Sequence, residues 1–383
     1  MQRSGSRILT THVGSLPAPL DLSPDADDYP ARLRAGVADV VRQQVDLGLD
    51  VVNDGELSKG NWLIYAAQRL NGFEPRRVDA SEAIIARGKD REDFAEFYAE
   101  ATRTGSLFHS SWGAVNTSNW STHWFATQPI TYTGTALVDR DIANLKAALA
   151  ASPATEAFLP VTAPASLEPY RSNAYYASET EYLYAFADAM RQEYERIAAA
   201  GLLVQIDDAW TAALWDRIGI QMGLEAFKAR CMLRVEILNH ALQNIPEERI
   251  RYHLCWGSWH GPHAYDLPLA DFVDVLLAVK AGAYLFEAAN VRHEHEYHIW
   301  ERVKLPGDRI LIPCVVTHST NLIEHPELVA ERIQRYVRLV GKERVIAGTD
   351  CGFGGRVHPQ LAWAKLAALT EGARLATHAL RDG

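Results

Sequence analysis

The sequence predicts an α/β fold in which parallel strands form a barrel covered by helices. Short apolar segments of strand length alternate along the chain with amphipathic segments of helix length. Several of the apolar segments end in a polar residue capable of chemistry, and barrels carry their active sites at these carboxyl ends of strands. The 383 residues fit one elaborated barrel, so we expect a single domain over residues 1–383.

The strands and helices can be placed in order along the chain. We expect eight barrel strands, at Arg7–Thr11, Asp50–Asn53, Phe158–Thr162, Leu202–Ile206, Arg251–Cys255, Ala283–Glu287, Ile310–Val316 and Arg344–Asp350. The expected helices are Tyr29–Gly48, Glu179–Ala200, Gly223–Asn244, Ala270–Ala281, His325–Val340 and Pro359–Leu380. A ninth, weaker strand at Ile130–Thr133 exceeds what a barrel needs, and we expect it outside the barrel.

Residues 87–128 interrupt this alternation. The segment is polar, aromatic and weakly periodic, and it contains Trp112, Trp120 and Trp124. Long irregular segments in compact domains are often lids or binding loops. We therefore expect an irregular, lid-like insertion that closes over the barrel mouth; packing against the outside of the barrel is the alternative.

The composition excludes several classes of partner. A net charge of −10 argues against nucleic acid or an anionic membrane surface. No apolar run reaches membrane-spanning length, and the N-terminus lacks the apolar centre of a signal peptide, so we expect a cytoplasmic protein. Four cysteines in so long a chain do not form a disulfide framework.

Three of the predicted strand ends carry residues that bind metals. His253 and Cys255 end one strand, Glu287 ends the next, and Cys351 follows the last. Because barrel strands end at one mouth, these nitrogen, sulfur and oxygen donors are expected to converge on one tetrahedral ion. Thiolate and imidazole donors favour Zn²⁺ over magnesium or calcium. The alternative for each cysteine is packing as a small buried residue.

Other strand ends carry polar groups as well. Ser15, Glu56 and Asp207 each follow a predicted strand, as does His318. Two carboxylates and a hydroxyl beside a metal could hold an ammonium group. His318 is a candidate for moving protons, because the pKa of a histidine lies near neutrality.

Over nearly its whole length the chain resembles the catalytic domain of the cobalamin-independent methionine synthase family. The resemblance rests on Glu287 and on six short segments: Thr10–Ser15, Leu47–Glu56, Gln205–Asp207, His253–Cys255, Val316–Ser319 and Asp350–Gly352. It implies a TIM-type (β/α)8 barrel and zinc-dependent methyl transfer to homocysteine, as in methionine biosynthesis. It also implies zinc ligands at His253, Cys255, Glu287 and Cys351, substrate binding by Ser15, Glu56 and Asp207, and a proton shuttle at His318.

The chain departs from the family pattern in two respects. It has only the catalytic barrel, whereas full-length methionine synthases carry a second one. The family's Pro-Val-Thr segment continues into a Trp-Ser that supports folate, but Thr162 is followed by Ala163-Pro164-Ala165-Ser166. The alkyl donor, folate or another molecule, is therefore open, and one of the insertion tryptophans is expected to replace the missing platform. Epoxyalkane:coenzyme M transferases, shorter relatives, provide the alternative function.

The chemistry expected of such a site is activation of a thiol. A free thiol has a pKa of about 8.5, and coordination to zinc removes its proton. A zinc hydrolase is a second possibility, although such enzymes use more histidine. A purely structural zinc is a third. Residues 293–298 are mainly expected to be a polar rim, although His295 and His298 would suit a second metal site if they lie on a helix. Gly352–Gly355 does not fit a nucleotide-binding loop.

Overall fold

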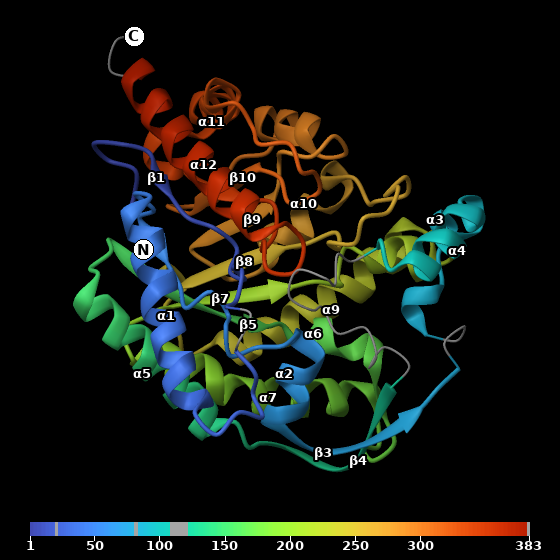
Figure 1. Ribbon diagram of the computed structural model, residues 1–383. Coiled ribbons are helices and arrows are strands. Elements are labelled where there is room, and N and C mark those ends of the chain that lie inside the picture. Colours follow the sequence, from blue (N-terminus) through green and yellow to red (C-terminus); the bar gives the residue numbers. More distant parts are fainter. Residues whose placement is uncertain (20–21, 80–82, 108–121, 381–383) are drawn as a thin grey trace.

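The computed structural model describes residues 1–19, 22–79, 83–107 and 122–380. At its centre lie eight parallel strands that neighbour one another in the order β1-β11-β10-β9-β8-β7-β5-β2 (Figure 1). Their bounds are β1 Leu9–Thr10, β2 Val51–Val52, β5 Glu156–Thr162, β7 Leu203–Asp208, β8 Ile250–Leu254, β9 Ala283–Glu287, β10 Ile310–Val316 and β11 Ile346–Thr349. All eight correspond to the strands expected from the sequence.

The sheet closes between its first and last strands. The Asp50 N–H, just before β2, donates to the carbonyl of Thr10 in β1 at 3.1 Å. The Thr11 hydroxyl donates to the Val51 carbonyl at 2.9 Å. These bonds join the two short edge strands, so the predicted TIM-type (β/α)8 barrel is confirmed.

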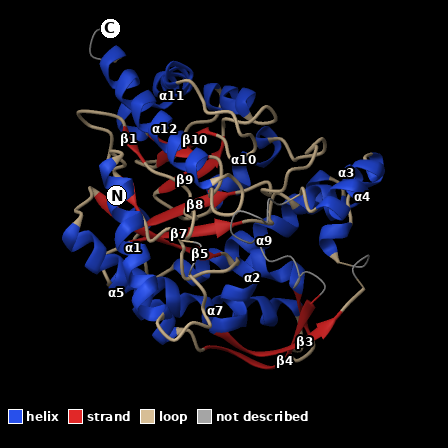
Figure 2. Cartoon of the chain, viewed as in Figure 1, coloured by secondary structure: helices blue, strands red, loops and turns tan. Residues whose placement is uncertain are grey.

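Helices cover the outside of the barrel (Figures 1 and 2). The helix α1 buries Leu33, Val37 and Val40, which recur at the three- and four-residue spacing of one helix face. Each of the six predicted helices is present. The longer helices are α1 Tyr29–Asp46, α5 Thr135–Ala151, α7 Glu179–Ala199, α9 Leu224–Leu242, α10 Leu269–Ala278, α11 Pro326–Val340 and α12 Pro359–Ala379. The shorter ones are α2 Trp62–Arg69, α3 Lys89–Asp93, α4 Ala95–Thr104, α6 Pro164–Leu167 and α8 Ile220–Met222.

The barrel interior combines an apolar layer with one buried cation. Leu9, Leu285 and Ile312 share an interior cluster that is separate from the main core between strands and helices. The Arg251 guanidinium stacks over the Phe158 ring at 3.8 Å. Burial lowers the pKa of Arg251 to about 9. The interior is therefore filled by side chains, and the open space lies at the mouth.

A small second sheet lies outside the barrel. It consists of β3 Leu70–Arg77, β4 Thr122–Tyr132 and β6 Arg171–Asn173 (Figure 2). The strand expected at Ile130–Thr133 is the end of β4, so its placement outside the barrel is confirmed. The hydrogen bonds of β4 to β3 extend back to Thr122, much further than its apolar residues indicate.

The insertion 87–128 is more regular than expected. It contains α3, α4 and the first part of β4, whereas the sequence led us to expect irregular structure. Trp112 and Trp120 lie outside the described residues. Trp124 lies in β4, where the Arg171 guanidinium packs over its ring at 5.0 Å. Pairing with β3 gives regular structure to a segment whose own sequence has little periodicity.

The described part of the insertion contacts the loop that follows β8. The indole N–H of Trp259 donates to the Tyr98 hydroxyl in α4 at 3.1 Å. The N–H of His260 donates to the Leu107 carbonyl at 2.9 Å, and the N–H of Ala264 donates to the Asp90 carboxylate at 2.9 Å. The insertion thus supports a loop at the barrel mouth.

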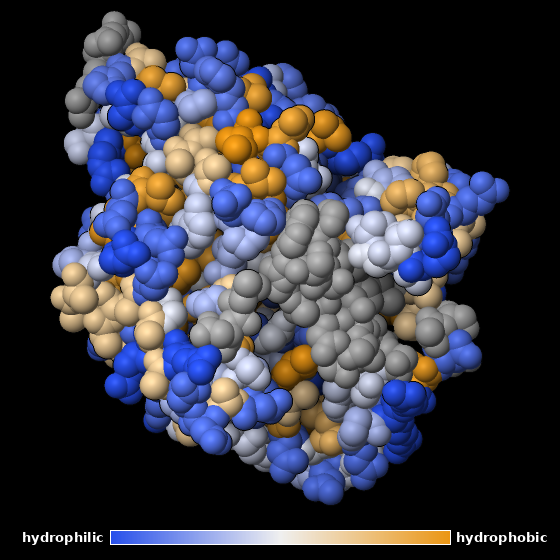
Figure 3. Space-filling model, in the orientation of Figure 1, coloured by the Kyte–Doolittle hydropathy of each residue, from blue (hydrophilic) through white to orange (hydrophobic). Residues whose placement is uncertain are grey.

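The outer surface has ordinary properties. Hydrophilic side chains dominate the face shown in Figure 3. Within the described ranges, no helix has both the length and the apolar character needed to cross a bilayer.

Candidate active site at the barrel mouth

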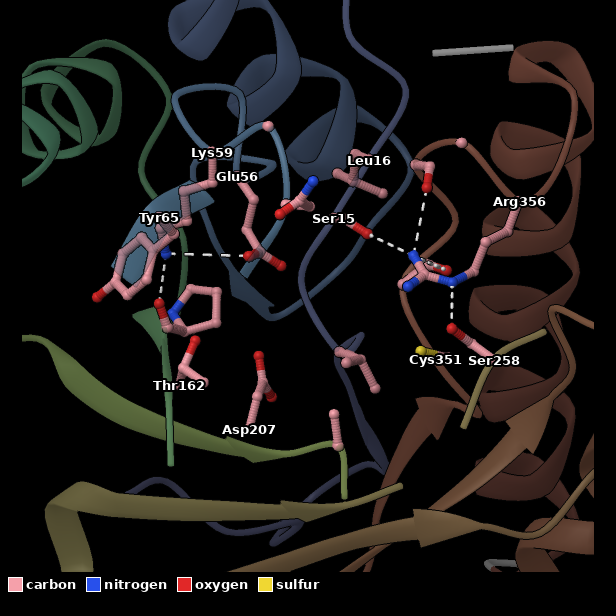
Figure 4. Close-up of a pocket in the computed structure, with 18 of the residues that line it drawn as sticks. Ser15, Leu16, Glu56, Lys59, Tyr65, Thr162, Asp207, Ser258, Cys351 and Arg356 are labelled. Atoms are coloured by element: carbon pink, nitrogen blue, oxygen red, sulfur yellow. Dashed lines mark hydrogen bonds and ion pairs between the residues drawn. The ribbon is translucent and has the colours of Figure 1, made fainter. Parts of the chain in front are cut away.

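A cavity of about 490 Å³ opens at the carboxyl ends of the barrel strands. Six of the eight residues predicted to form a site line it: Ser15, Glu56, Asp207, His253, Cys255 and Cys351. They come from loops and strand ends far apart in the sequence, and Figure 4 shows Ser15, Glu56, Asp207 and Cys351 around one space. The other two, Glu287 and His318, are buried and are not among the residues that line the cavity.

Asp207 fixes the orientation of the His253 ring. Its Oδ1 lies 3.1 Å from His253 Nδ1. A carboxylate only accepts hydrogen bonds, so Nδ1 carries a proton, and in the neutral ring Nε2 carries the lone pair. That Nε2 is buried and has no hydrogen-bond partner. Burial would lower the pKa of His253, but the hydrogen bond and charge of Asp207 outweigh it and raise the pKa.

The two cysteines lie against each other. The Cys255 thiol donates a hydrogen bond to the Cys351 sulfur. This bond raises the pKa of Cys255 well above its usual value and lowers that of Cys351 well below. The Gly257 N–H also donates to the Cys255 sulfur, at 3.2 Å. These opposite shifts favour one thiol beside one thiolate, and binding of a metal ion would displace the remaining proton.

Glu287 is held by the residues behind the cavity. The Trp256 N–H donates to its Oε1 at 3.2 Å, and Asn290 Nδ2 donates to its Oε2 at 2.5 Å. Asp350 fixes the same strand end, because it accepts the N–H groups of Ala288 and Ala289 at 2.9 and 3.2 Å. Burial raises the pKa of Glu287 and raises that of Asp350 to about 8.

The predicted metal ligands His253, Cys255, Glu287 and Cys351 come together, but they do not form a complete metal site. Across residues 1–19, 22–79, 83–107 and 122–380, no group of three or more His, Cys, Asp or Glu side chains could hold a metal ion in the present arrangement. The chemistry of the donors nevertheless fits zinc: a buried imidazole nitrogen without a partner, two sulfurs sharing one proton, and a buried carboxylate.

Glu56 reaches the cavity from a strained turn. Its backbone φ is +57°, in the left-handed region that residues with a Cβ seldom adopt. The turn is held because the Glu56 N–H donates to the Asp54 carboxylate at 3.0 Å and the Gly55 carbonyl accepts the Leu16 N–H at 3.0 Å. Such strain is commonly found at functional sites. Burial raises the pKa of Glu56 to about 8; the charge of Lys59 opposes this shift and that of Asp207 adds to it.

Ser15 packs against the glycine-rich turn that follows β11. The Ser15 carbonyl accepts the N–H groups of Phe353 and Gly354 at 2.8 and 3.1 Å. A Cβ on Gly352 would collide with the Ser15 hydroxyl oxygen. Glycine is therefore required here by close approach, and the contact sets Ser15 beside Cys351.

His318 is buried behind the site. It follows β10, and its Nδ1 has no hydrogen-bond partner within the described part of the chain. Burial, reinforced by the charge of Arg356 and by neighbouring histidines, lowers the pKa of His318 well below its usual value. The side chain is therefore a neutral imidazole at pH 7.

A second polar cluster lies next to Glu287. Asp266 Oδ2 is 3.0 Å from His263 Nδ1 and 3.1 Å from His293 Nε2. The other nitrogen of His293 lies 2.7 Å from Glu296 Oε2. With a carboxylate at each ring nitrogen, His293 is an imidazolium, and its pKa is raised to about 10 by these partners against the effect of burial. The sequence marked residues 293–298 as a polar segment, but it did not indicate that His293 would pair with Asp266.

The cavity is also lined by side chains that were not predicted from the sequence, among them Lys59, Tyr65, Trp210, Trp259 and Arg356. Lys59 follows Glu56 by three residues, lies 3.9 Å from it, and donates to the Pro160 carbonyl. Except for Tyr65 in α2, they lie in turns and loops, and there only tertiary packing decides which way a side chain points. Trp124, expected at the cavity, does not line it; Trp210 and Trp259 do.

Comparison with known proteins places this site in context. No protein-family model matches the chain. A methionine synthase from Thermococcus kodakarensis is 21% identical over 389 residues, covering 98% of this chain and 95% of that one. A 2-hydroxypropyl-CoM lyase from Xanthobacter autotrophicus is 24% identical over 228 residues, covering 52% and 56%. A solved structure of a B12-independent methionine synthase from a Shewanella species, in complex with selenomethionine, superposes with a TM-score of 0.71 at 17% identity, covering 98% and 100%.

The chain is similar to methionine synthases over almost its whole length, and it shares the fold of the B12-independent methionine synthase. The resemblance inferred from short motifs is thus confirmed along the whole chain. The similarity to the methionine synthase spans almost all of both sequences, whereas that to the lyase spans about half of each.

Proposed function

We propose that this protein is a zinc-dependent S-methyltransferase that converts homocysteine to methionine. The observation that carries the proposal is the combination, at one cavity, of a thiolate- and imidazole-bearing donor set with two carboxylates suited to an ammonium group. A thiol that carries an amino group, as homocysteine does, matches both halves of this cavity.

His253, Cys255, Glu287 and Cys351 would hold the ion. When bound, zinc lowers the pKa of a coordinated thiol so that the substrate is a thiolate at neutral pH. Asp207 prepares His253 by holding the proton on Nδ1, which leaves Nε2 free to coordinate. Asn290 and the Trp256 N–H restrain the Glu287 carboxylate, as partners of metal ligands commonly do.

The amino group of the substrate would lie between Glu56 and Asp207. Both carboxylates line the cavity, and Glu56 has its pKa raised to about 8 by burial. An ammonium group beside it would favour the ionised form and reverse that shift. Substrate binding would thus offset the unfavourable environment of Glu56, and Ser15 adds a hydroxyl beside Cys351.

His318 would serve as the proton acceptor of the site. Its imidazole is neutral, its Nδ1 has no described partner, and it follows β10 at the barrel mouth. The lowered pKa makes this imidazole a weak base, so it would hold a proton released by a thiol only briefly and pass it on to a leaving group. The insertion and Trp259 would limit the access of water to the activated donor.

The cavity also has room for the alkyl donor. Apolar and aromatic side chains also line it, including Leu16, Tyr29 and Tyr65. Trp210, on the loop after β7, offers a flat surface at the site although no tryptophan follows Thr162. These features suit a flat donor such as a methylated folate. Transfer from a small epoxide to coenzyme M is the second candidate function, since the lyase relative is named for that thiol.

Four free cysteines suit a reducing compartment, and we place the reaction in the cytoplasm. The direct test is an alkylation screen with zinc-loaded protein that crosses homocysteine and coenzyme M with methyl-folate, small epoxides and simple methyl donors. Formation of methionine supports the proposal. Alkylation of coenzyme M alone would replace it with the second candidate.

The metal has a test of its own. Purified protein should contain about one zinc per chain by elemental analysis, and a Cys255→Ser, Cys351→Ser variant should lose it. Cys231→Ala is the matched control, because Cys231 is buried in α9 away from the cavity. Full zinc retention by the double variant would refute the ligand assignment.

A further inference from the structure

Arg356 is a cation at the cavity with no carboxylate partner among the described residues. It lies five positions after Cys351, beyond the glycine-rich turn, and it lines the cavity (Figure 4). Within the described ranges, no ion pair joins its guanidinium to an aspartate or glutamate, and its Nη2 donates no hydrogen bond. Arg356 is half-buried at the cavity wall, and its guanidinium has donors left for an anionic ligand.

The existing contacts of Arg356 orient the side chain without using that capacity. Its Nε donates to the Ser258 hydroxyl at 2.6 Å. Its Nη1 makes three long contacts, at 3.3 to 3.5 Å, with the Ser15 hydroxyl and the carbonyls of Gly354 and Gly352. Only one of the five guanidinium N–H groups therefore makes a short bond, and the contacts with two hydroxyls and two carbonyls fix its direction.

The charges of the cavity are divided between two sides. Figure 4 shows Arg356, Ser258 and Cys351 on one side of Ser15, and Glu56 and Lys59 on the other. Lys59 is partly engaged, since it lies 3.9 Å from Glu56 and donates to the Pro160 carbonyl. Arg356 is thus the cation best able to accept a new anionic partner near the sulfur pair.

We propose that Arg356 and Ser258, with the Ser15 hydroxyl, form an anion subsite that binds the α-carboxylate of the thiol substrate. A guanidinium presents parallel N–H groups that match the two oxygens of a carboxylate. A zwitterionic amino acid would then lie across the cavity, with its carboxylate at Arg356, its ammonium group at Glu56 and Asp207, and its sulfur toward Cys255 and Cys351.

This assignment rests on the proposed function and makes it more specific. A sulfonated thiol without an amino group could also bind Arg356, but it would bring no cation to the two carboxylates, Glu56 and Asp207, that line the cavity. An uncharged thiol would offer a charged partner to neither side. The arrangement therefore favours a thiol amino acid, which brings an anion to Arg356 and a cation to the carboxylates, over both alternatives.

The test removes the guanidinium and the carboxylate separately. Dissociation constants of zinc-loaded protein are measured by calorimetry for homocysteine and for 3-aminopropanethiol, which is homocysteine without its carboxylate. Arg356→Met should weaken homocysteine binding by about 30- to 100-fold, as expected for loss of a charge-assisted pair, and should change 3-aminopropanethiol binding less than about twofold. Arg356→Lys should fall between the wild type and Arg356→Met for homocysteine.

Arg292→Met is the matched control, because Arg292 also donates to a loop carbonyl but does not line the cavity. Its affinities and those of the wild type should agree. Equal losses of homocysteine and 3-aminopropanethiol binding in Arg356→Met would overturn the subsite while leaving the proposed function intact.

Coenzyme M and 1-propanethiol separate the two failures. A wild type that binds coenzyme M and not homocysteine overturns the proposed function and the carboxylate assignment together. In that case, a selective loss of coenzyme M binding in Arg356→Met would still support an anion subsite. A loss shared with 1-propanethiol would overturn the subsite too.

Discussion

His293 provides a stability prediction with a defined pH window. Its ring lies between Glu296, 2.7 Å away, and Asp266, 3.1 Å away, and its pKa is raised to about 10 from the usual 6.5. The neighbouring charged groups are His263, which also bonds Asp266, and Glu287. The folded protein therefore keeps a proton on this ring over a pH range in which the unfolded chain has lost it.

The sign of the effect follows from that difference. A folded-state pKa above the unfolded one gives stability that is fully present below pH 6.5 and is lost as the pH rises through about 10. One proton of difference lowers the free energy of unfolding by about 1.4 kcal/mol per pH unit. Between pH 7 and 9.5, the advantage of the wild type over His293→Gln should shrink by about 3 kcal/mol.

Urea unfolding at several pH values, followed by fluorescence, measures this advantage directly. His298→Gln is the matched control: His298 lies 2.7 Å from Glu301, but its side chain is 56% exposed, so its pairing should contribute little. The difference between wild type and His298→Gln should stay flat with pH. A flat difference for His293→Gln as well would show that His293 is not an imidazolium in the folded protein.

Two further variants test the packing and orientation of the site. Gly352→Ala should lower the free energy of unfolding by about 1 to 3 kcal/mol in urea denaturation, because the new Cβ collides with Ser15, whereas Gly5→Ala, with open space around it, should have almost no effect. Equal effects of the two would contradict the close approach. Asp207→Ala should weaken zinc binding by about 10- to 100-fold in competition with a chelator, because His253 loses its orienting partner. Unchanged zinc affinity would contradict that role.

The sequence determined the barrel because its strands are continuous apolar runs bounded by turns. Strands such as β9 and β10 were predicted to the residue, since both of their faces are buried and the run itself marks the strand. The first and last strands of the sheet, β1 and β2, pair over only two residues each, although longer strands were expected. Their length depends on closure of the barrel, which local sequence does not specify.

The strand β3 and the helices α2 and α5 were not expected from the sequence. The strand β3 is polar over most of its length, and its pairing with β4 determines its conformation. The buried residues of α5 recur at an ordinary helical spacing, although no helix was expected at Thr135–Ala151. The insertion was expected to be irregular for a similar reason. The pairing of β4 with β3, and not local periodicity, gives its last part a regular structure.

The site could be located from the sequence but not completed. The rule that barrel strands end at one mouth brought six predicted residues to one cavity. It did not reveal that the Glu287 carboxylate would accept a hydrogen bond from Asn290, or that His318 would be buried. Arg356 could not have been found, because its position depends on the close packing of the Gly352 turn against Ser15.

We infer that a thiol substrate binds at a metal held by two cysteines, a histidine and a glutamate in this cavity. Cobalt-substituted protein tests it most directly, since the intensity of thiolate-to-cobalt charge-transfer absorption reports the number of coordinated sulfurs. We expect absorption from two thiolates in the free protein and an increase by about half on saturation with homocysteine, as a third thiolate joins the ion. Stoichiometric cobalt binding with no change in this absorption on saturation with homocysteine would show that the thiol of the substrate does not bind the metal.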